Sequence, residues 1–356
     1  MSDTPVPSTG STTTPTRGGH YVASWFHIDD TRLGVYAQVA GSSHDERFLD
    51  VYRRCIGLFY LSSRRANPDA ELLLYTNTHW DPSASAVARQ VDGWLDALDV
   101  KRVVVPYGFE PPASFTRNWR NQFYVFDVLK DLQQRTQAGR GFTVLDSDVM
   151  WLSRDTAQAF WHEVTQAICR LELHTDPDER ENGLSGRELS ALLQQQEPVT
   201  YCGGEIVAGP TSEIERLLAE CTDIYARLIG QHGADDSIKF EEAHVLSAAY
   251  QRMRTTALDP RVHIKRMWTQ PFRYKTVQSG DENIALWHVP AEKQFGLDRI
   301  YRSVARRGTD WALATTDGEW SRLLREELGV PQNSRRKVAL DVIAAARRRL
   351  RNMRKR

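Results

Sequence analysis

The chain has 356 residues, of which 41% are hydrophobic, enough for one large α/β domain or two smaller ones. Its formal net charge is +0, but residues 335–356 hold ten Lys or Arg and one Asp, so this segment carries +9 and the remainder −9. A mildly acidic body argues against broad binding of a nucleic-acid backbone by the globular part.

Residues 1–19 are rich in Ser, Thr, Pro and Gly and contain no apolar run. This composition predicts a disordered tail and excludes a secretory signal. The four cysteines form no C-x-x-C pair, so their spacing suits neither a zinc site nor a disulfide framework. No apolar run approaches the ~18 residues that span a bilayer. We therefore expect a cytoplasmic protein.

Strands and helices are expected to alternate along the chain. Predicted strands cover 21–27, 70–77, 100–107, 141–146, 200–209 and 282–290, and predicted helices cover 45–64, 85–98, 118–135, 158–169, 212–230 and 240–253. Residues 173–197 are polar and expected to be rich in loops. Alternation of this kind predicts an α/β fold with a mainly parallel sheet and helices on both faces. No linker divides the chain, so we predict a single domain over 20–330.

Two carboxylates follow the apolar strand 141–146. Asp146 and Asp148 are separated by one residue, and side chains at positions i and i+2 of an extended chain point to the same side. Ligands of open parallel sheets bind beyond the carboxyl ends of the strands, where this pair would lie. The two charges repel each other unless a cation lies between them, and Mg²⁺ or Mn²⁺ suits oxygen ligands. A turn whose aspartates cap the next element is the alternative.

With its "VLDSDVMWL" segment, the chain resembles the GT-A-fold glycosyltransferases. Within them it is most similar to the family 8 group that includes glycogenin and the bacterial lipopolysaccharide galactosyltransferases. The resemblance rests on the order of motifs over residues 20–300. It implies one Rossmann-like GT-A domain and a nucleotide-sugar donor, expected to be a UDP-sugar, whose diphosphate is held by Mn²⁺ or Mg²⁺. It further implies that Asp146 contacts the ribose and the ion and that Asp148 binds the ion.

The segment "TYCGGEIVAG" (200–209) resembles a second motif of the family, a strand with a small-residue pair. Gly203 and Gly204 leave room for a sugar ring to approach the backbone, although a bulge in a core strand is nearly as good an explanation. Glu205 is a candidate contact for donor hydroxyls or a candidate catalytic base. It could equally face a solvated edge.

Two later segments resemble the remaining family motifs. In "FEEAHVLS", Glu242 matches the first acidic position and His244 the second, with Glu241 as the adjacent alternative and helix capping as the competing role. In "LWHVPAEKQFG", the resemblance implies that His288 is the third metal ligand. Lys293 is a candidate contact for the diphosphate, but it comes one residue earlier than in the family motif.

The start of the helix 118–135 and the end of the first strand supply further candidates for donor binding. Arg120 could pair with phosphate and Asn121 could contact the nucleotide, whereas Arg117 is better explained as part of a solvated helix end. Ser24 is a candidate for the base pocket. If transfer inverts the sugar, Glu205, Glu241 or Glu242 could be the base. The resemblance favours retention, in which the donor phosphate takes the acceptor proton.

Residues 335–356 place apolar side chains at helical spacing, at positions 339, 342, 343, 346, 350 and 353, opposite a cationic face. This pattern predicts a basic amphipathic helix that contacts anionic lipid at the inner membrane face, where lipid-linked acceptors would be presented. Packing on the acidic body and a tail without a partner are the alternatives. A tail that holds nucleic acid, as in a DNA-modifying glycosyltransferase, is a minor reading. A nucleotidyltransferase is a rival function, but the chain lacks a glycine-rich basic loop after its first strand.

Overall fold

The computed structural model describes residues 19–29, 39, 45–115, 119–233, 239–269 and 276–353. Arg117 and almost all of the predicted N-terminal tail, residues 1–18, lie outside these ranges.

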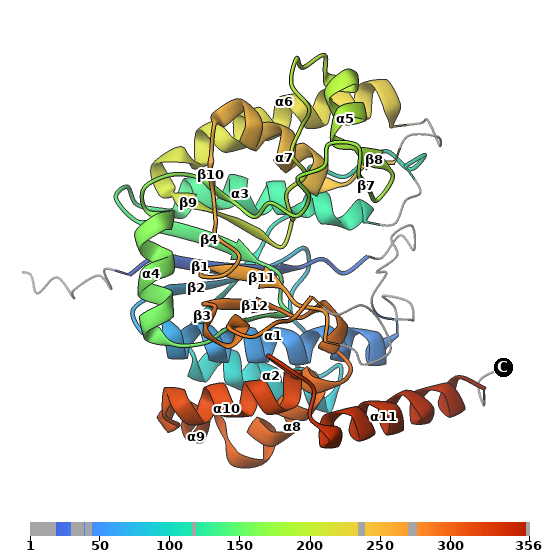
Figure 1. The fold of residues 1–356 in the computed structure, drawn as a ribbon. Helices are drawn as coiled ribbons and strands as arrows, with labels where there is room; N and C mark the ends of the chain where they lie inside the picture. Colours follow the sequence, from blue (N-terminus) through green and yellow to red (C-terminus); the bar gives the residue numbers. More distant parts are fainter. Residues whose placement is uncertain are drawn as a thin grey trace, which may run out of the picture.

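The centre of the molecule is a seven-stranded sheet with the order β10–β6–β9–β4–β1–β2–β3 (Figure 1). Four neighbouring strands run parallel, and three further strands complete the other edge. Here β9 is antiparallel to β4, β6 is antiparallel to β9, and β10 is parallel to β6. The strands are β1 (Tyr21–Phe26), β2 (Glu71–Thr76), β3 (Val100–Val104), β4 (Gly141–Leu145), β6 (Cys169–Arg170), β9 (Ile206–Pro210) and β10 (Thr256–Ala257). The expectation of a mainly parallel α/β sheet is confirmed.

Strand β2 shows how the sheet forms two cores. Because side chains alternate along a strand, Leu72 and Leu74 enter the cluster on one face, and Leu73 and Tyr75 enter the cluster on the other. All four side chains are almost completely buried. An apolar run without polar alternation is what a strand covered on both faces requires.

Helices cover both faces of the sheet, as Figure 1 shows. The first cluster is closed by α1 (Glu46–Ala66), α2 (Ala86–Ala97), α4 (Arg154–Val164), α8 (Gly296–Arg307), α9 (Thr309–Ala314) and α10 (Asp317–Leu328). The second is closed by α3 (Tyr124–Arg135), α5 (Gly186–Leu193), α6 (Ile214–His232) and α7 (Glu242–Met253). Residues 296–328, for which no helix or strand is predicted from the sequence, form three helices.

A second, three-stranded sheet brings distant parts of the chain together at the carboxyl end of β4. Strand β12 (Leu286–His288) lies between β11 (Ile264–Arg266), to which it is parallel, and β5 (Val149–Trp151), to which it is antiparallel. In this register His288 lies opposite Val149, and the amide of Val289 donates to the carbonyl of Asp148 across 3.1 Å. The sheet therefore carries His288 to the residues that follow β4.

Several predicted boundaries are wrong. The strand expected over 200–209 begins at Ile206, because the residues around the Gly203–Gly204 pair form a turn in which Cys202 makes only an isolated bridge. The helix expected over 158–169 begins at Arg154 and ends at Val164. The region expected to be loop contains the hairpin β7 (Arg180–Glu181) and β8 (Leu184–Ser185) and helix α5, which begins with a Ser185–Glu188 capping box.

The predicted C-terminal helix is α11 (Arg335–Met353), drawn in red in Figure 1, where it runs outward beyond α10. Among the described helices, none is both long and apolar enough to cross a bilayer.

Candidate active site

Three side chains converge where β4 ends. Asp146 follows β4, Asp148 precedes β5, and His288 is the last residue of β12. His288 Nε2 lies 3.3 Å from Asp148 Oδ2 and 3.7 Å from Asp146 Oδ2, and one ligand atom from each residue fits within 4.8 Å of the others. The structure thus brings together the three residues that the sequence analysis names as metal ligands.

The three ligand atoms suit a divalent cation. His288 Nε2 is buried and makes no hydrogen bond, although two carboxylates face it. A buried imidazole nitrogen without a partner is costly unless a ligand occupies it. Two carboxylates with one imidazole suit Mn²⁺, and the carboxylates alone suit Mg²⁺.

The other ring nitrogen of His288 is held by Glu205. Nδ1 lies 3.1 Å from Glu205 Oε1, and Arg266 donates to both oxygens of the same carboxylate at 2.8 and 2.6 Å. Burial alone would lower the pKa of His288, but the charges of Asp148 and Glu205 raise it to about 9. Burial opposes ionisation of Glu205, yet Arg266 and His288 outweigh it and lower the pKa of this carboxyl. Both oxygens of Glu205 are therefore engaged, Oε1 by His288 and Arg266 and Oε2 by Arg266 alone.

Lys293 reaches the same cluster from the opposite side. It follows the short helix η4 (Pro290–Glu292), and its Nζ forms a close ion pair with Asp148 Oδ2. Burial opposes ionisation of Asp148, but Lys293 and His288 outweigh it and hold the pKa of this carboxyl below its usual range. Partial burial and the charge of Asp148 raise the pKa of Asp146. The pair at 146 and 148 is thus asymmetric, with Asp148 the better anion.

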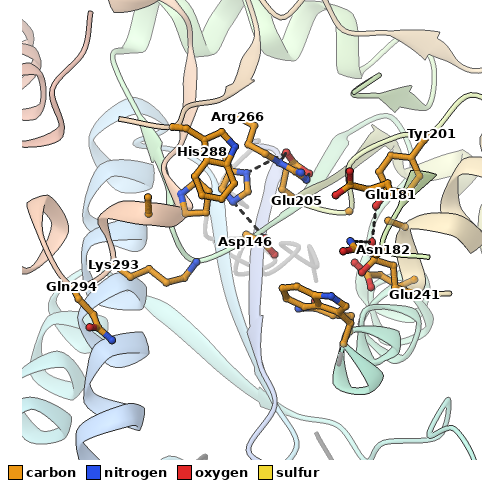
Figure 2. Close-up of a pocket in the computed structure, with 18 of the residues that line it drawn as sticks. Asp146, Glu181, Asn182, Tyr201, Glu205, Glu241, Arg266, His288, Lys293 and Gln294 are labelled. Atoms are coloured by element: carbon orange, nitrogen blue, oxygen red, sulfur yellow. Dashed lines mark hydrogen bonds and ion pairs between the residues drawn. The ribbon is translucent and has the colours of Figure 1, made fainter. Parts of the chain in front are cut away.

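A pocket of about 670 Å³ opens next to these residues. Figure 2 shows Lys293 and Gln294 on one side of Asp146, and Asn182, Tyr201 and Glu241 on the other. The lining combines charged groups with aromatic rings. It consists of Trp119, Gln122, Asp146, Glu181, Asn182, Tyr201, Gly204, Glu205, Glu241, Glu242, Ala243, Arg266, Trp268, His288, Pro290, Ala291, Lys293, Gln294, Phe295 and Arg348.

The glycine pair allows two carboxylates to approach the backbone closely. A Cβ atom on Gly204 would lie 2.3 Å from Glu242 Oε1, and one on Gly203 would lie 2.0 Å from Glu205 Oε2. Both separations are far inside van der Waals contact. The sequence analysis expects a close approach at these glycines, and the groups that approach are side chains of the protein.

Glu242 begins α7 and turns its carboxyl group toward the pocket. Its Oε2 is buried and has no hydrogen-bond partner. Burial and the neighbouring charge of Glu241 raise the pKa of Glu242 well above its ordinary value. Glu241 is engaged differently, because its Oε1 accepts hydrogen bonds from Tyr201 Oη at 2.5 Å and Asn182 Nδ2 at 2.7 Å.

Four candidate donor contacts lie outside the lining of the pocket, namely Ser24, Arg120, Asn121 and Gly203. Arg120 is 1% exposed and donates to the Glu110 carboxylate at 2.8 Å and to the carbonyl of Pro111 at 2.9 Å, so its guanidinium holds the loop before α3. Ser24 and Asn121 are buried, at 0% and 5% exposure. The expectation that Arg120 meets a phosphate finds no support in these contacts.

Several lining residues were missed from the sequence. Arg266 and Trp268 belong to "HIKRMW", in which two adjacent cations stand between apolar residues, and this was the available signal. Trp119 has a left-handed backbone, with φ of 74°, a conformation that is uncommon for a bulky residue and concentrates at functional sites. Arg348 comes from α11, for which a membrane surface and packing on the body were both expected as partners, but not a place in the pocket.

No known family model matches the chain, and no curated protein matches it significantly. Solved structures do. One is the bifunctional glycosyltransferase WbbM, with a TM-score of 0.51 and 10% identity over 91% of this chain and 53% of that one. Another is the galactosyltransferase LgtC with donor and acceptor sugar analogues, with a TM-score of 0.48 and 12% identity over 85% of this chain and 99% of that one. The likeness to WbbM, together with the observed sheet, shows that the chain has a GT-A-type glycosyltransferase fold.

Proposed function

We propose that the protein is a metal-dependent glycosyltransferase that moves a sugar from a nucleotide-sugar donor to an acceptor hydroxyl. The observation that carries this proposal is the convergence of Asp146, Asp148 and His288 beside a pocket in a glycosyltransferase fold. The order of motifs supports a UDP-sugar donor and a relationship to family 8. A carbohydrate or a lipid-linked acceptor fits the same motifs.

In this proposal Asp146, Asp148 and His288 hold Mn²⁺ or Mg²⁺. A bound divalent cation stabilises the charge that develops on a leaving diphosphate. Glu205 orients His288 so that Nε2 points to the ion, as partners of metal-bound imidazoles commonly do. We therefore assign Glu205 this positioning role and do not retain it as a candidate base.

Lys293 has two partners in turn. In the protein alone it neutralises Asp148. With a cation held at Asp148, the ammonium group of Lys293, which already lines the pocket, would be available to bind a donor phosphate. This exchange keeps a positive charge beside Asp148 in both states.

Glu242 is the remaining carboxyl group with an unpartnered oxygen at the pocket. Its raised pKa and its place beside Gly204 suit a group that hydrogen-bonds the transferred sugar. With retention, the donor phosphate takes the acceptor proton and Glu242 positions the sugar. With inversion, Glu242 would be the base, because Glu241 already accepts two hydrogen bonds.

We also propose that α11 contacts an anionic membrane surface. Val342, Ile343 and Leu350 are 43%, 46% and 56% exposed, and among the described residues they are half of the six large hydrophobic side chains that are exposed. They share the outer face of the helix, which the exposed residues Arg347 and Arg349 flank. An apolar face turned away from the body with arginines beside it suits a lipid surface.

Isothermal titration tests the main proposal. Nucleoside diphosphates and nucleotide sugars are titrated into the protein with and without Mn²⁺. We expect binding of a nucleoside diphosphate only with metal, slow hydrolysis of one nucleotide sugar, and loss of both in Asp148→Ala. Binding of nucleoside triphosphates with release of pyrophosphate would instead support a nucleotidyltransferase. Metal-independent binding, or full hydrolysis by Asp148→Ala, would refute the proposed metal site.

A further inference from the structure

Helix α11 turns a charged face toward the body. Lys337, Asp341, Ala344 and Arg348 follow one another at spacings of three and four residues, so they share one side of the helix. Lys337 is completely buried, and its Nζ lies 2.8 Å from Glu292 Oε1 and 2.7 Å from Asp341 Oδ2. A buried ammonium group needs such partners, and the ion pair with Glu292, which lies outside α11, fixes the rotation of the helix.

This rotation brings Arg348 to the pocket. Arg348 lies about three helical turns beyond Lys337 on the same face and lines the pocket together with Lys293. Its guanidinium carbon is 4.7 Å from the centroid of the Phe295 ring, and its Nη1 donates a close hydrogen bond to Gln294 Oε1. Both contacts orient a planar cation at the wall of the pocket.

The charges of the pocket are divided between its two ends. Figure 2 shows Lys293 and Gln294 on one side of Asp146 and Glu241 on the other. Arg348 belongs to the first side, because it is hydrogen-bonded to Gln294, and Glu242 directly follows Glu241. A diphosphate is favoured at the cationic end, and a neutral sugar with many hydroxyls is favoured at the end that offers carboxyl oxygens.

We propose that Arg348 of α11 binds the diphosphate of the donor together with Lys293, which makes the C-terminal helix part of the active site. This inference rests on the proposed function. The first turn of α11 is anchored beside Lys293, because Lys337 is paired with Glu292, the residue directly before Lys293. A guanidinium group can give a phosphate two parallel hydrogen bonds, which an ammonium group cannot.

The test compares Arg348→Gln with Arg349→Gln. Both changes remove one positive charge from α11, but Arg349 is exposed and is not among the residues that line the pocket. Inorganic pyrophosphate and the nucleoside diphosphate that binds wild type are titrated into each protein with saturating Mn²⁺. We expect Arg348→Gln to weaken both ligands roughly 10-fold or more, and Arg349→Gln to weaken them less than about twofold. The affinity for Mn²⁺ alone should be unchanged in both variants.

The outcomes separate this inference from the function on which it rests. If wild type binds the nucleoside diphosphate with metal and Arg348→Gln binds it as well as Arg349→Gln does, the role of Arg348 is refuted and the transferase proposal stands. A loss confined to the nucleoside diphosphate, with pyrophosphate unaffected, also refutes a diphosphate contact. If wild type binds neither ligand in the presence of metal, the proposed function fails and this inference fails with it.

Discussion

Glu205 and His288 are joined by a hydrogen bond of 3.1 Å, although 83 residues separate them in the chain. The same carboxylate accepts hydrogen bonds from Arg266, so a single buried acid links β11, β12 and the turn before β9. Because Nδ1–H donates to Glu205, Nε2 is the nitrogen that would give up its proton and bind a cation.

Replacing Glu205 with Gln should therefore weaken metal binding. The amide keeps the shape of the side chain but removes the charge that orients the imidazole, and loss of such a partner typically costs about 10–100-fold in metal affinity. Arg266→Gln is the matched control, since it removes the other partner of Glu205 and leaves the contact with His288 in place. Titration with Mn²⁺ and urea unfolding would be measured for both. Equal losses of Mn²⁺ affinity would contradict a specific role for Glu205.

Gly204→Ala should disturb Glu242 while the fold persists. The added Cβ would lie 2.3 Å from Glu242 Oε1, so the carboxyl group must move away from its place at the pocket. A displacement of this size can cost on the order of 100-fold in turnover, which donor hydrolysis would report. Gly230→Ala in α6 is the control, because nothing lies within 4 Å of the added atom. It should leave turnover unchanged and raise stability by about 0.5–1 kcal/mol.

The contribution of His244 to the stability of the protein should fall as the pH drops from 8 to 5. Burial lowers the pKa of this imidazole from 6.5 to about 4. Its Nδ1 accepts the amide of Glu241 and its Nε2 lies 3.1 Å from the carbonyl of Glu181, so the native ring is neutral. The unfolded chain takes up the proton first as the pH falls, and this removes roughly 2 kcal/mol of stability over that interval.

Urea unfolding at the two pH values, for wild type and His244→Gln, isolates this contribution. Glutamine cannot titrate, so the loss between pH 8 and 5 should shrink by about 2 kcal/mol in the variant. Glu181 and Glu241 bond the ring through backbone atoms, and both residues remain in the variant. The same pH dependence in both proteins would exclude His244 as its source.

The parallel half of the sheet could be predicted because its strands are buried on both faces. Runs such as Leu72–Leu74 carry a strong apolar signal, and the helices between them show clear spacing. Residues 206–210 were predicted as a strand, but its start was placed six residues too early because Gly203 and Gly204 read equally well as strand or turn. The helices over 296–328 were not recognised, although Thr316 and Glu319 form a capping box at the start of α10.

The residues of the site differ in how well they can be predicted from the sequence. Asp146 follows a short apolar strand, Asp148 precedes one and His288 ends one, so all three could be proposed as metal ligands from local pattern and motif order. Arg266 and Arg348 reach the site only through tertiary contacts, with Glu205 and with Phe295. Nothing in the spacing of a chain states which distant partner a cation will meet. The orientation of α11 could not be predicted for the same reason. Its pattern shows an apolar face, but it does not show that the opposite face docks through buried ion pairs.

Ile343→Asp combined with Leu350→Asp should reduce binding to vesicles that contain anionic lipid. Each side chain would bury apolar area worth about 1.5–3 kcal/mol at a lipid surface, so losing both should lower the partition coefficient at least about tenfold. Leu313→Asp in α9 is the control, because Leu313 is also a large exposed hydrophobic residue, at 37%, but lies on another helix. Cosedimentation with anionic and with neutral vesicles measures the partition.

Wild type that binds both vesicles equally, or a control that loses as much binding as the double variant, would argue against α11 as the lipid-contacting element. Retained binding of nucleoside diphosphate in the double variant would show that the outer face of the helix acts separately from the inner face that carries Arg348.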